Sequence, residues 1–143
     1  MNAQNTGIVD AARDWIGTPY RHQASRIGVG CDCLGLVRGI WQRIYGQNIG
    51  PVPVYTQFGR DPESAFQLLE AAQYYLNETK SLPVPGAVML FQLHKKLPPR
   101  HCGIFVGDDQ FIHAQEHLGV VQVSFDKSWH RRMHSTYLFP KKV

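Results

Sequence analysis

The sequence predicts a mixed α+β fold in which helices from the first half of the chain pack on an antiparallel sheet from the second half. Up to about residue 76, apolar residues recur at the three- and four-residue spacing of helices. From residue 87 onward they fall into short β-rich runs separated by turn residues. Helices followed by strands are typical of the α+β class. With 143 residues, 43% of them hydrophobic, the chain can bury a proper core, and we expect one domain over residues 1–143.

Three helices are expected in the first half. They are a helix capped by Asn5 or Thr6 that ends at Gly17, a helix capped by Asp32 that ends at Gly46, and a helix that starts at Asp61-Pro62-Glu63 and reaches Leu76. An irregular surface segment is predicted over residues 47–60, where Pro51 and Pro53 oppose regular structure.

About five strands are expected in the second half. Their predicted ranges are 87–93, 101–107, 110–115, 119–125 and 135–139. The intervening sequences, such as Asp108-Asp109, read as turns that would join neighbouring strands into an antiparallel sheet.

The second predicted helix contains a candidate catalytic cysteine, Cys33. A glycine-rich turn ends at Asp32, so Cys33 falls in the first turn of an apolar helix. The unpaired N–H groups and the dipole at a helix start favour negative charge, and a thiol there ionises more easily than a free cysteine. The alternative is that Cys33 packs as a small core residue, because free cysteines are usually buried and inert.

Two of the seven histidines lie inside apolar strand patterns. His101 opens the strand 101–107, and His113 sits within the strand 110–115. A hairpin at Gly107 would place both imidazoles on the same sheet face, and the helix that bears Cys33 could dock across that face. A cysteine nucleophile needs such a base, held by a third polar group. Either histidine alone could be a hydrogen-bonded core residue, but the pair together with a helix-start cysteine favours catalysis.

A zinc site is the alternative use of the same residue types. Cys31, Cys33, His101 and Cys102 are all possible ligands. However, Cys-x-Cys and adjacent His-Cys are not usual ligand spacings, and neighbours on a strand point to opposite faces. We therefore expect no metal and no cofactor. The odd number of cysteines also excludes a closed disulfide framework within the chain.

The formal charge of +4 is concentrated late in the chain, where residues 127–143 contain five Lys or Arg and no acid. Such a run is more typical of a solvated face than of a site for an anionic polymer, and we expect no nucleic-acid partner. The first residues lack the basic start and apolar run of a signal peptide, so we expect synthesis in the cytoplasm without one. No stretch approaches the roughly 18 apolar residues of a membrane span.

Five blocks of the sequence, in this order and spacing, resemble the NlpC-type cysteine peptidases of bacterial cell walls. The blocks are Gly17-Thr18-Pro19-Tyr20, Cys31-Asp32-Cys33-Leu34-Gly35-Leu36-Val37, Pro85-Gly86-Ala87-Val88, His101-Cys102-Gly103-Ile104-Phe105-Val106-Gly107 and Phe111-Ile112-His113-Ala114. The resemblance spans roughly residues 7–140. The amino-acid sequence of residues 18–25 and 31–41 is most similar to that of compact peptidases encoded with the tails of phages and of phage-like gene transfer agents.

The resemblance implies a papain-like fold and hydrolysis of an amide bond in peptidoglycan stem peptides, usually the bond between D-glutamate and diaminopimelate. By motif, Cys33 would be the nucleophile, His101 its base and His113 the residue that orients His101. Tyr20 would support the oxyanion beside the Cys33 N–H. Asp32 has two compatible interpretations, as the helix N-cap and as an anchor for the free amine of a stem peptide. Cys31 and Cys102 are interpreted as structural.

One departure from the family concerns specificity. Many relatives have serine directly after the catalytic cysteine, where this chain has Leu34, so the stem-peptide preference of the family does not transfer directly.

The implied setting is a phage-like particle whose tail proteins would be partners and which would carry the enzyme to the cell wall or periplasm. Two alternatives remain open: a structural tail-tip subunit with little turnover, and a thiol amidase or acyltransferase on the same fold.

Overall fold

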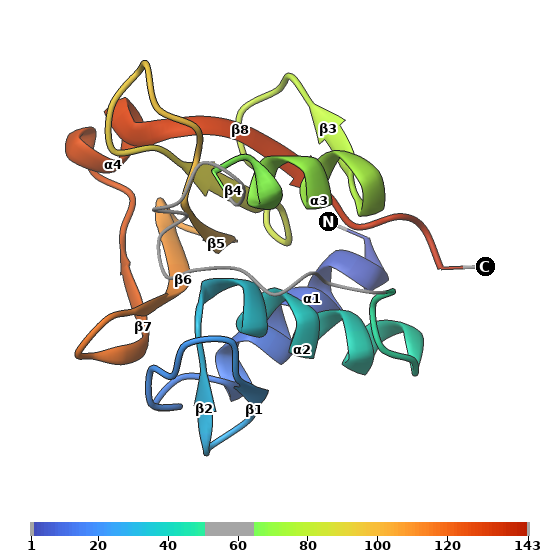
Figure 1. Ribbon diagram of the computed structural model, residues 1–143. Coiled ribbons are helices and arrows are strands. Elements are labelled where there is room, and N and C mark those ends of the chain that lie inside the picture. Colours follow the sequence, from blue (N-terminus) through green and yellow to red (C-terminus); the bar gives the residue numbers. More distant parts are fainter. Residues whose placement is uncertain (1, 51–64, 143) are drawn as a thin grey trace.

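In the computed structural model, which describes residues 2–50 and 65–142, two long helices, α1 and α2, pack side by side against one face of an antiparallel sheet (Figure 1). The elements are α1 Ala3–Asp14, β1 Ser25–Arg26, β2 Gly30–Cys31, α2 Cys33–Tyr45, α3 Gln67–Tyr75, β3 Asn77–Thr79, β4 Val88–Phe91, β5 His101–Gly107, β6 Gln110–Gln115, β7 Gly119–Ser124, α4 Lys127–Arg132 and β8 Met133–Leu138. The predicted α+β class is confirmed.

The main sheet has six strands within the described residues, in the order β3-β8-β4-β5-β6-β7, and all neighbours are antiparallel. The predicted bounds of β5 and β6 are confirmed, because both strands are long, apolar and delimited by turns. About five strands were predicted, and β3 was not among them. Three polar residues at the edge of a sheet carry no alternation that could reveal a strand.

The helix that begins with Cys33 has the predicted caps. The Asp32 side chain accepts the Gly35 N–H, and Gly46 ends the helix with φ 74°, the left-handed conformation that glycine adopts freely. In contrast, α1 is capped by Asn2 rather than by Asn5 or Thr6, because the Asn2 side chain accepts the Asn5 N–H. The predicted helix start at 61–63 and most of the predicted surface segment at 47–60 lie outside the described residues.

The sheet has two chemically different faces. On the helix face, Cys102, Ile104, Ile112 and Ala114 belong to one core with the apolar sides of α1 and α2. On the aromatic face, which we define by Phe91, Phe105, Phe111 and Phe125, the ring of Trp129 from α4 completes a second core. His101 and His113 alternate with the helix-face residues along β5 and β6, and both therefore belong to the aromatic face.

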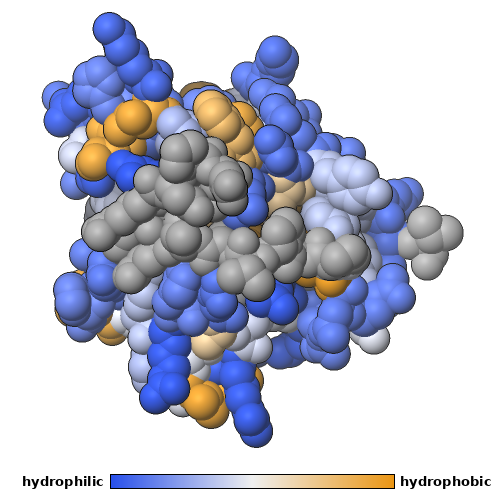
Figure 2. Space-filling model, in the orientation of Figure 1, coloured by the Kyte–Doolittle hydropathy of each residue, from blue (hydrophilic) through white to orange (hydrophobic). Residues whose placement is uncertain are grey.

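The outside of the molecule in this view is largely hydrophilic (Figure 2). A small apolar patch lies over the β1–β2 hairpin at the bottom of the view, and Ile27 and Val29 in the turn of that hairpin are 48% and 53% exposed. None of the helices in the described part of the chain is long and apolar enough to cross a bilayer.

Candidate active site

Cys33 is the first residue of α2, and its side chain is half-buried. The N–H groups of the first helical turn have no partner within the helix, and their dipoles point toward the start of α2. The sulfur therefore lies where a negative charge is stabilised by backbone that is already in place.

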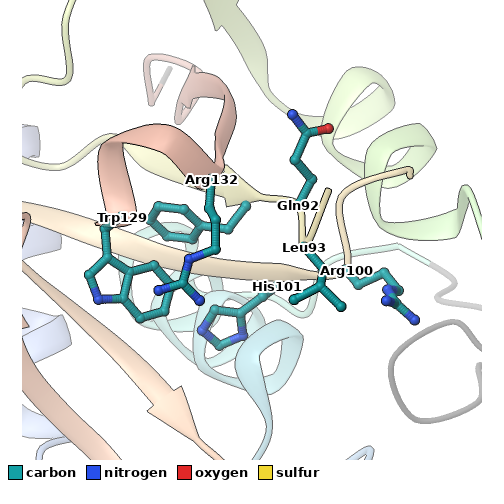
Figure 3. A pocket seen from close by; sticks show the side chains of 7 residues that line it. Gln92, Leu93, Arg100, His101, Trp129 and Arg132 are labelled. Carbon is teal, nitrogen blue, oxygen red and sulfur yellow. The ribbon is translucent and has the colours of Figure 1, made fainter. Parts of the chain in front are cut away.

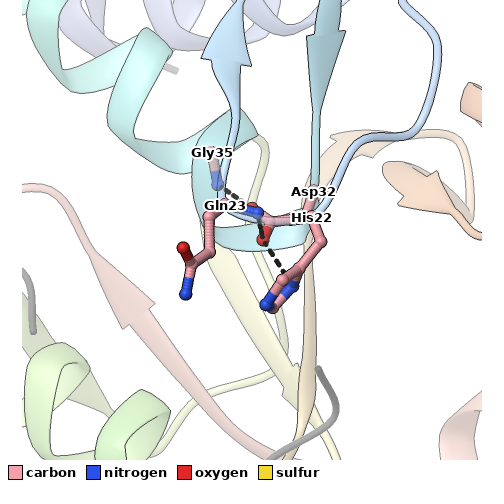
Figure 4. A network of polar contacts seen from close by, with 4 residues as sticks. All are labelled: His22, Gln23, Asp32 and Gly35. Carbon is pink, nitrogen blue, oxygen red and sulfur yellow. Dashed lines mark hydrogen bonds and ion pairs between the residues drawn. The ribbon is translucent and has the colours of Figure 1, made fainter. Parts of the chain in front are cut away.

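The carboxylate of Asp32 fixes this helix start. Its Oδ1 accepts the N–H of Gly35 and its Oδ2 accepts the N–H of Gln23, both at 2.7 Å, and His22 Nδ1 lies 3.8 Å from Oδ2 (Figure 4). Because only 2% of Asp32 is exposed, these bonds tie the preceding loop to the first turn of α2 in a largely dry environment. The N-cap interpretation of Asp32 is confirmed, and its role as an anchor for a substrate amine stays a prediction.

The two imidazoles of the aromatic face are directly connected. His101 Nε2 and His113 Nδ1 lie 2.7 Å apart, and β5 pairs with β6 through Ile104 opposite Ile112. The predicted placement of both histidines on one sheet face is confirmed. Gly103 leaves room for them, since a Cβ there would lie 3.2 Å from the His113 Cβ and 2.9 Å from the Phe111 ring.

The expectation that the cysteine helix docks across the histidine face is wrong. The helix α2 packs on the opposite, helix face, over Cys102 and Ile104. The thiol still reaches His101 because each residue is the first of its element, so the two side chains meet at the beginning of β5. Their proximity affects the thiol, because hydrogen bonding and the positive charge of His101 both help to lower the pKa of Cys33.

The surroundings of Cys33 favour its ionised form and lower its pKa from 9.0 to about 5. The largest cause is a hydrogen bond from the Cys102 thiol, followed by the hydrogen bond and the positive charge of His101. Burial and the charge of Asp32 act in the opposite direction and are outweighed. Cys33 is therefore a thiolate at neutral pH, as a cysteine nucleophile requires.

The pKa of His113 is lowered from 6.5 to about 3, mainly by burial and further by the positive charges of His101 and Arg132. His113 therefore stays neutral above pH 3. The Nδ1 of a neutral His113 can accept a hydrogen bond from the N–H at His101 Nε2, and contacts with Phe111 and Trp129 hold the His113 ring. His113 Nε2 is buried and has no hydrogen-bond partner among residues 2–50 and 65–142.

Cys102, interpreted from the sequence as a structural residue, lies beside the reactive group. Its Sγ donates to the Cys33 carbonyl oxygen at 3.3 Å, and the hydrogen bond to Cys33 together with burial raises its own pKa well above 9.0. Cys102 is therefore a permanent S–H donor beside the thiolate. Burial raises the pKa of Cys31 to about 12, so that thiol also stays protonated.

Replacing Cys102 with alanine should raise the pKa of Cys33, because it removes the largest stabilisation of the thiolate. The alkylation rate of wild-type Cys33 by iodoacetamide should rise with a midpoint near pH 5, where the thiolate forms. In Cys102→Ala the midpoint should move upward by about one pH unit. The measurement is the pH dependence of labelling at the peptide that contains Cys33. Cys31→Ala is the matched control, and an equal shift in both variants would contradict the specific role of Cys102.

Tyr20 lies next to the strand that leads into Cys33. It forms a parallel bridge with Cys31, and its half-buried ring packs against the core of the helix face. This places Tyr20 beside the loop before α2, and its predicted support of an oxyanion stays a prediction.

A cleft of about 310 Å³ opens beside His101 (Figure 3). Its lining residues are Phe91, Gln92, Leu93, Arg100, His101, Trp129 and Arg132. Trp129 and Arg132 were not predicted at the site, because α4 has only six residues and no periodicity to reveal a buried side. Two local signals were present: Asp126, which caps α4 by accepting the Trp129 N–H, and the basic run after residue 127, of which Arg132 lines this cleft.

In the part of the chain that the structure describes, no three His, Cys, Asp or Glu side chains converge as ligands for a metal ion. The three cysteines are free thiols. The groups that this site brings together are a thiolate and a connected pair of imidazoles.

Several known proteins are similar to this chain in sequence or fold. Residues 17–137 match the model of the NlpC/P60 family, a range that contains Cys33, His101 and His113. The murein DD-endopeptidase MepS/murein LD-carboxypeptidase of Escherichia coli K12 is 28% identical over 126 residues, which cover 87% of this chain and 57% of that protein. The probable endopeptidase NlpC of the same organism is 30% identical over 122 residues, 84% of this chain and 68% of that protein. This chain thus spans little more than half the length of MepS.

Among solved structures, the NlpC/p60 domain of the peptidoglycan hydrolase SagA superposes with a TM-score of 0.62 at 23% identity, covering 96% of this chain and 98% of that domain. The fold is therefore the papain-like fold of that domain. The family model covers most of the chain, and the chain is a member of the NlpC/P60 family.

Proposed function

We propose that this protein is a cysteine endopeptidase that hydrolyses an amide bond in the stem peptides of peptidoglycan. The observation that carries the proposal is the connected series Cys33, His101 and His113, with a thiolate pKa of about 5 and 2.7 Å between the two imidazoles. Membership of the NlpC/P60 family and the names of its murein-cleaving relatives indicate the substrate class.

In the proposed reaction, the Cys33 thiolate attacks the amide carbonyl carbon and forms a tetrahedral intermediate. The developing oxyanion is stabilised by the N–H donors at the start of α2 and, in our proposal, by the Tyr20 hydroxyl. These donors are already oriented because Asp32 holds the first turn in place. Collapse of the intermediate breaks the C–N bond and leaves a thioester on Cys33.

His101 moves the proton in both steps. As an imidazolium beside the thiolate, it gives its proton to the leaving amine, and as a neutral base it then removes a proton from the water that hydrolyses the thioester. His113 accepts a hydrogen bond from His101 Nε2, which leaves the other ring nitrogen directed at the sulfur. His113 suits this orienting role because its low pKa keeps it neutral and therefore an acceptor.

We propose, more specifically, that the bond cleaved is the amide between D-glutamate and diaminopimelate. The similarity of the five motif blocks to NlpC-type peptidases supports it, whereas the name of MepS refers to DD-endopeptidase and LD-carboxypeptidase activities. Cleavage at the D-glutamate–diaminopimelate bond, at a DD bond or at an LD bond releases fragments of different mass. Incubation with purified sacculi under reducing conditions, followed by mass analysis of soluble fragments, distinguishes them.

Wild-type protein should release fragments that begin with diaminopimelate, and Cys33→Ala should release none. If folded wild-type protein releases no fragment, the endopeptidase proposal is wrong and a structural role on the same fold is favoured. Release of fragments cut at another amide bond would support the endopeptidase proposal but contradict the proposed bond. Transfer of the acyl group to an added amine, instead of hydrolysis, would identify an acyltransferase.

We also propose that the enzyme acts as a tail-associated component of a phage or phage-like gene transfer agent, exported within the particle. Support comes from the resemblance of residues 18–25 and 31–41 to the compact peptidases encoded with such tails. Immunodetection of the chain in density-purified particles, at a constant ratio to a tail protein, tests this setting. Detection only in the particle-free fraction would contradict it without affecting the proposed chemistry.

A further inference from the structure

The cleft beside His101 is cationic and lies on one side of the proposed catalytic centre. Two of its lining residues are Arg100 and Arg132, and no lining residue in the described part of the chain is an acid. All of its described lining residues follow residue 90, so Cys33 and the loop before α2 are not part of its wall. The cleft therefore extends from the base of the proposed reaction and not from the nucleophile.

Arg132 is held rigidly in this cleft. Its guanidinium carbon lies 4.0 Å from the centre of the Trp129 ring, and its Nε and one Nη donate to the backbone oxygen and the hydroxyl of Ser128, at 3.4 and 3.1 Å. In Figure 3 the guanidinium lies between the Trp129 ring and the imidazole of His101. The other Nη makes no hydrogen bond within the described residues. A guanidinium fixed in this way is a preorganised donor for a planar anion.

The guanidinium of Arg132 adds positive charge beside the imidazole pair. Its charge contributes to the low pKa of His113 and so opposes positive charge on that ring. The proposed reaction nevertheless requires an imidazolium on His101. A carboxylate bound to Arg132 would offset the repulsion at the stage when the imidazolium is needed.

The cleft adjoins His101 and not Cys33, and this position indicates which part of a substrate would enter it. The leaving amine must reach His101 to receive its proton, so the residue that supplies this amine lies toward the wall of the cleft that His101 forms. We propose that Arg132 binds a side-chain carboxylate of the residue that supplies the leaving amine. This inference rests on the proposed function and deepens it. It assigns to Arg132 the selection of stem peptides whose amine-supplying residue has a side-chain carboxylate, which diaminopimelate carries and lysine lacks.

The experiment uses three synthetic stem peptides that differ only in the amine-supplying residue. This residue is diaminopimelate, its side-chain amide, or lysine. Wild-type protein should have a kcat/KM for the free carboxylate about tenfold above that for the other two, the effect of one partly exposed charged hydrogen-bonded pair. In Arg132→Gln the ratio between the three peptides should fall to about one.

Arg131→Gln is the matched control, because Arg131 is an exposed arginine on the same helix. It should retain the wild-type ratio. Arg132→Lys should retain part of the preference, since it keeps the charge but loses the planar fork. This variant also tests the role if Arg132→Gln fails to fold.

Equal cleavage of the three peptides by the wild type would overturn the carboxylate site while leaving the endopeptidase proposal intact. An equal loss of activity on all three peptides in Arg132→Gln would show that Arg132 only supports the structure, and this too would overturn the inference. Cleavage of none of them by the wild type would reject the proposed function itself.

Discussion

Cys33→Ala should lower kcat/KM on stem peptides by about 10⁴-fold or more, because no other group can form the covalent intermediate. The other two cysteines cannot replace it, since Cys31 and Cys102 are buried thiols with raised pKa values. The variant should fold normally, because Cys33 is only half-buried and alanine favours the helix. Far-UV circular dichroism and thermal unfolding check the fold, and chromatographic product analysis measures the rate. Residual activity within tenfold of the wild type would exclude Cys33 as the nucleophile.

The same nucleophile predicts the acid limit of the wild-type enzyme. With a Cys33 pKa of about 5, the thiolate is fully formed at neutral pH and is lost as the pH falls through 5. Below that pH, kcat/KM should fall about tenfold per unit as protonation removes the nucleophile. An acid limb near pH 8.5, the range of an ordinary thiol, would contradict the stabilised thiolate. Cys102→Ala should move this limb upward together with the midpoint of alkylation.

Gly35→Ala should reduce the free energy of unfolding by about 3 kcal/mol or more, the largest loss of stability that we expect from a single methyl group here. A Cβ at this position would lie 1.8 Å from the Ala24 backbone oxygen and 2.9 Å from its carbonyl carbon. The Gly35 N–H donates to Asp32, and its carbonyl oxygen accepts the Ser25 hydroxyl at 2.6 Å. Separating the loop from α2 would therefore break the cap that places Cys33.

Gly7→Ala is the control for this substitution. Gly7 also lies inside a helix, but the nearest atom to its Cβ would be Ile44 Cδ1 at 3.6 Å, an ordinary contact. Because alanine favours helices by up to about 1 kcal/mol over glycine, this variant should be equally or more stable than the wild type. Urea unfolding of both variants, with thiol labelling at Cys33, gives stability and site integrity together. Wild-type stability in Gly35→Ala would refute the close approach of the loop.

Local sequence chemistry was sufficient for the elements that hold the proposed catalytic residues. Asp32 and Gly46 define α2 because an N-cap acceptor and a left-handed glycine act within one turn of the helix. The strands with His101 and His113 were predictable because apolar runs between turns specify both register and face. By contrast, β3 and α4 are too short to show a periodic pattern, and contacts with β8 and with the aromatic face fix their positions.

By itself the sequence determined a helix-start cysteine and two histidines on one face of a hairpin, since these depend on interactions between residues close along the chain. Only the tertiary structure decided that α2 packs on the opposite face and meets His101 at the beginning of β5, that Cys102 donates to the Cys33 carbonyl oxygen, and that Trp129 and Arg132 line the cleft. Those contacts join residues as far apart as Cys33 and Cys102, which are 69 positions apart, and their geometry depends on packing of the whole sheet, which no local pattern encodes.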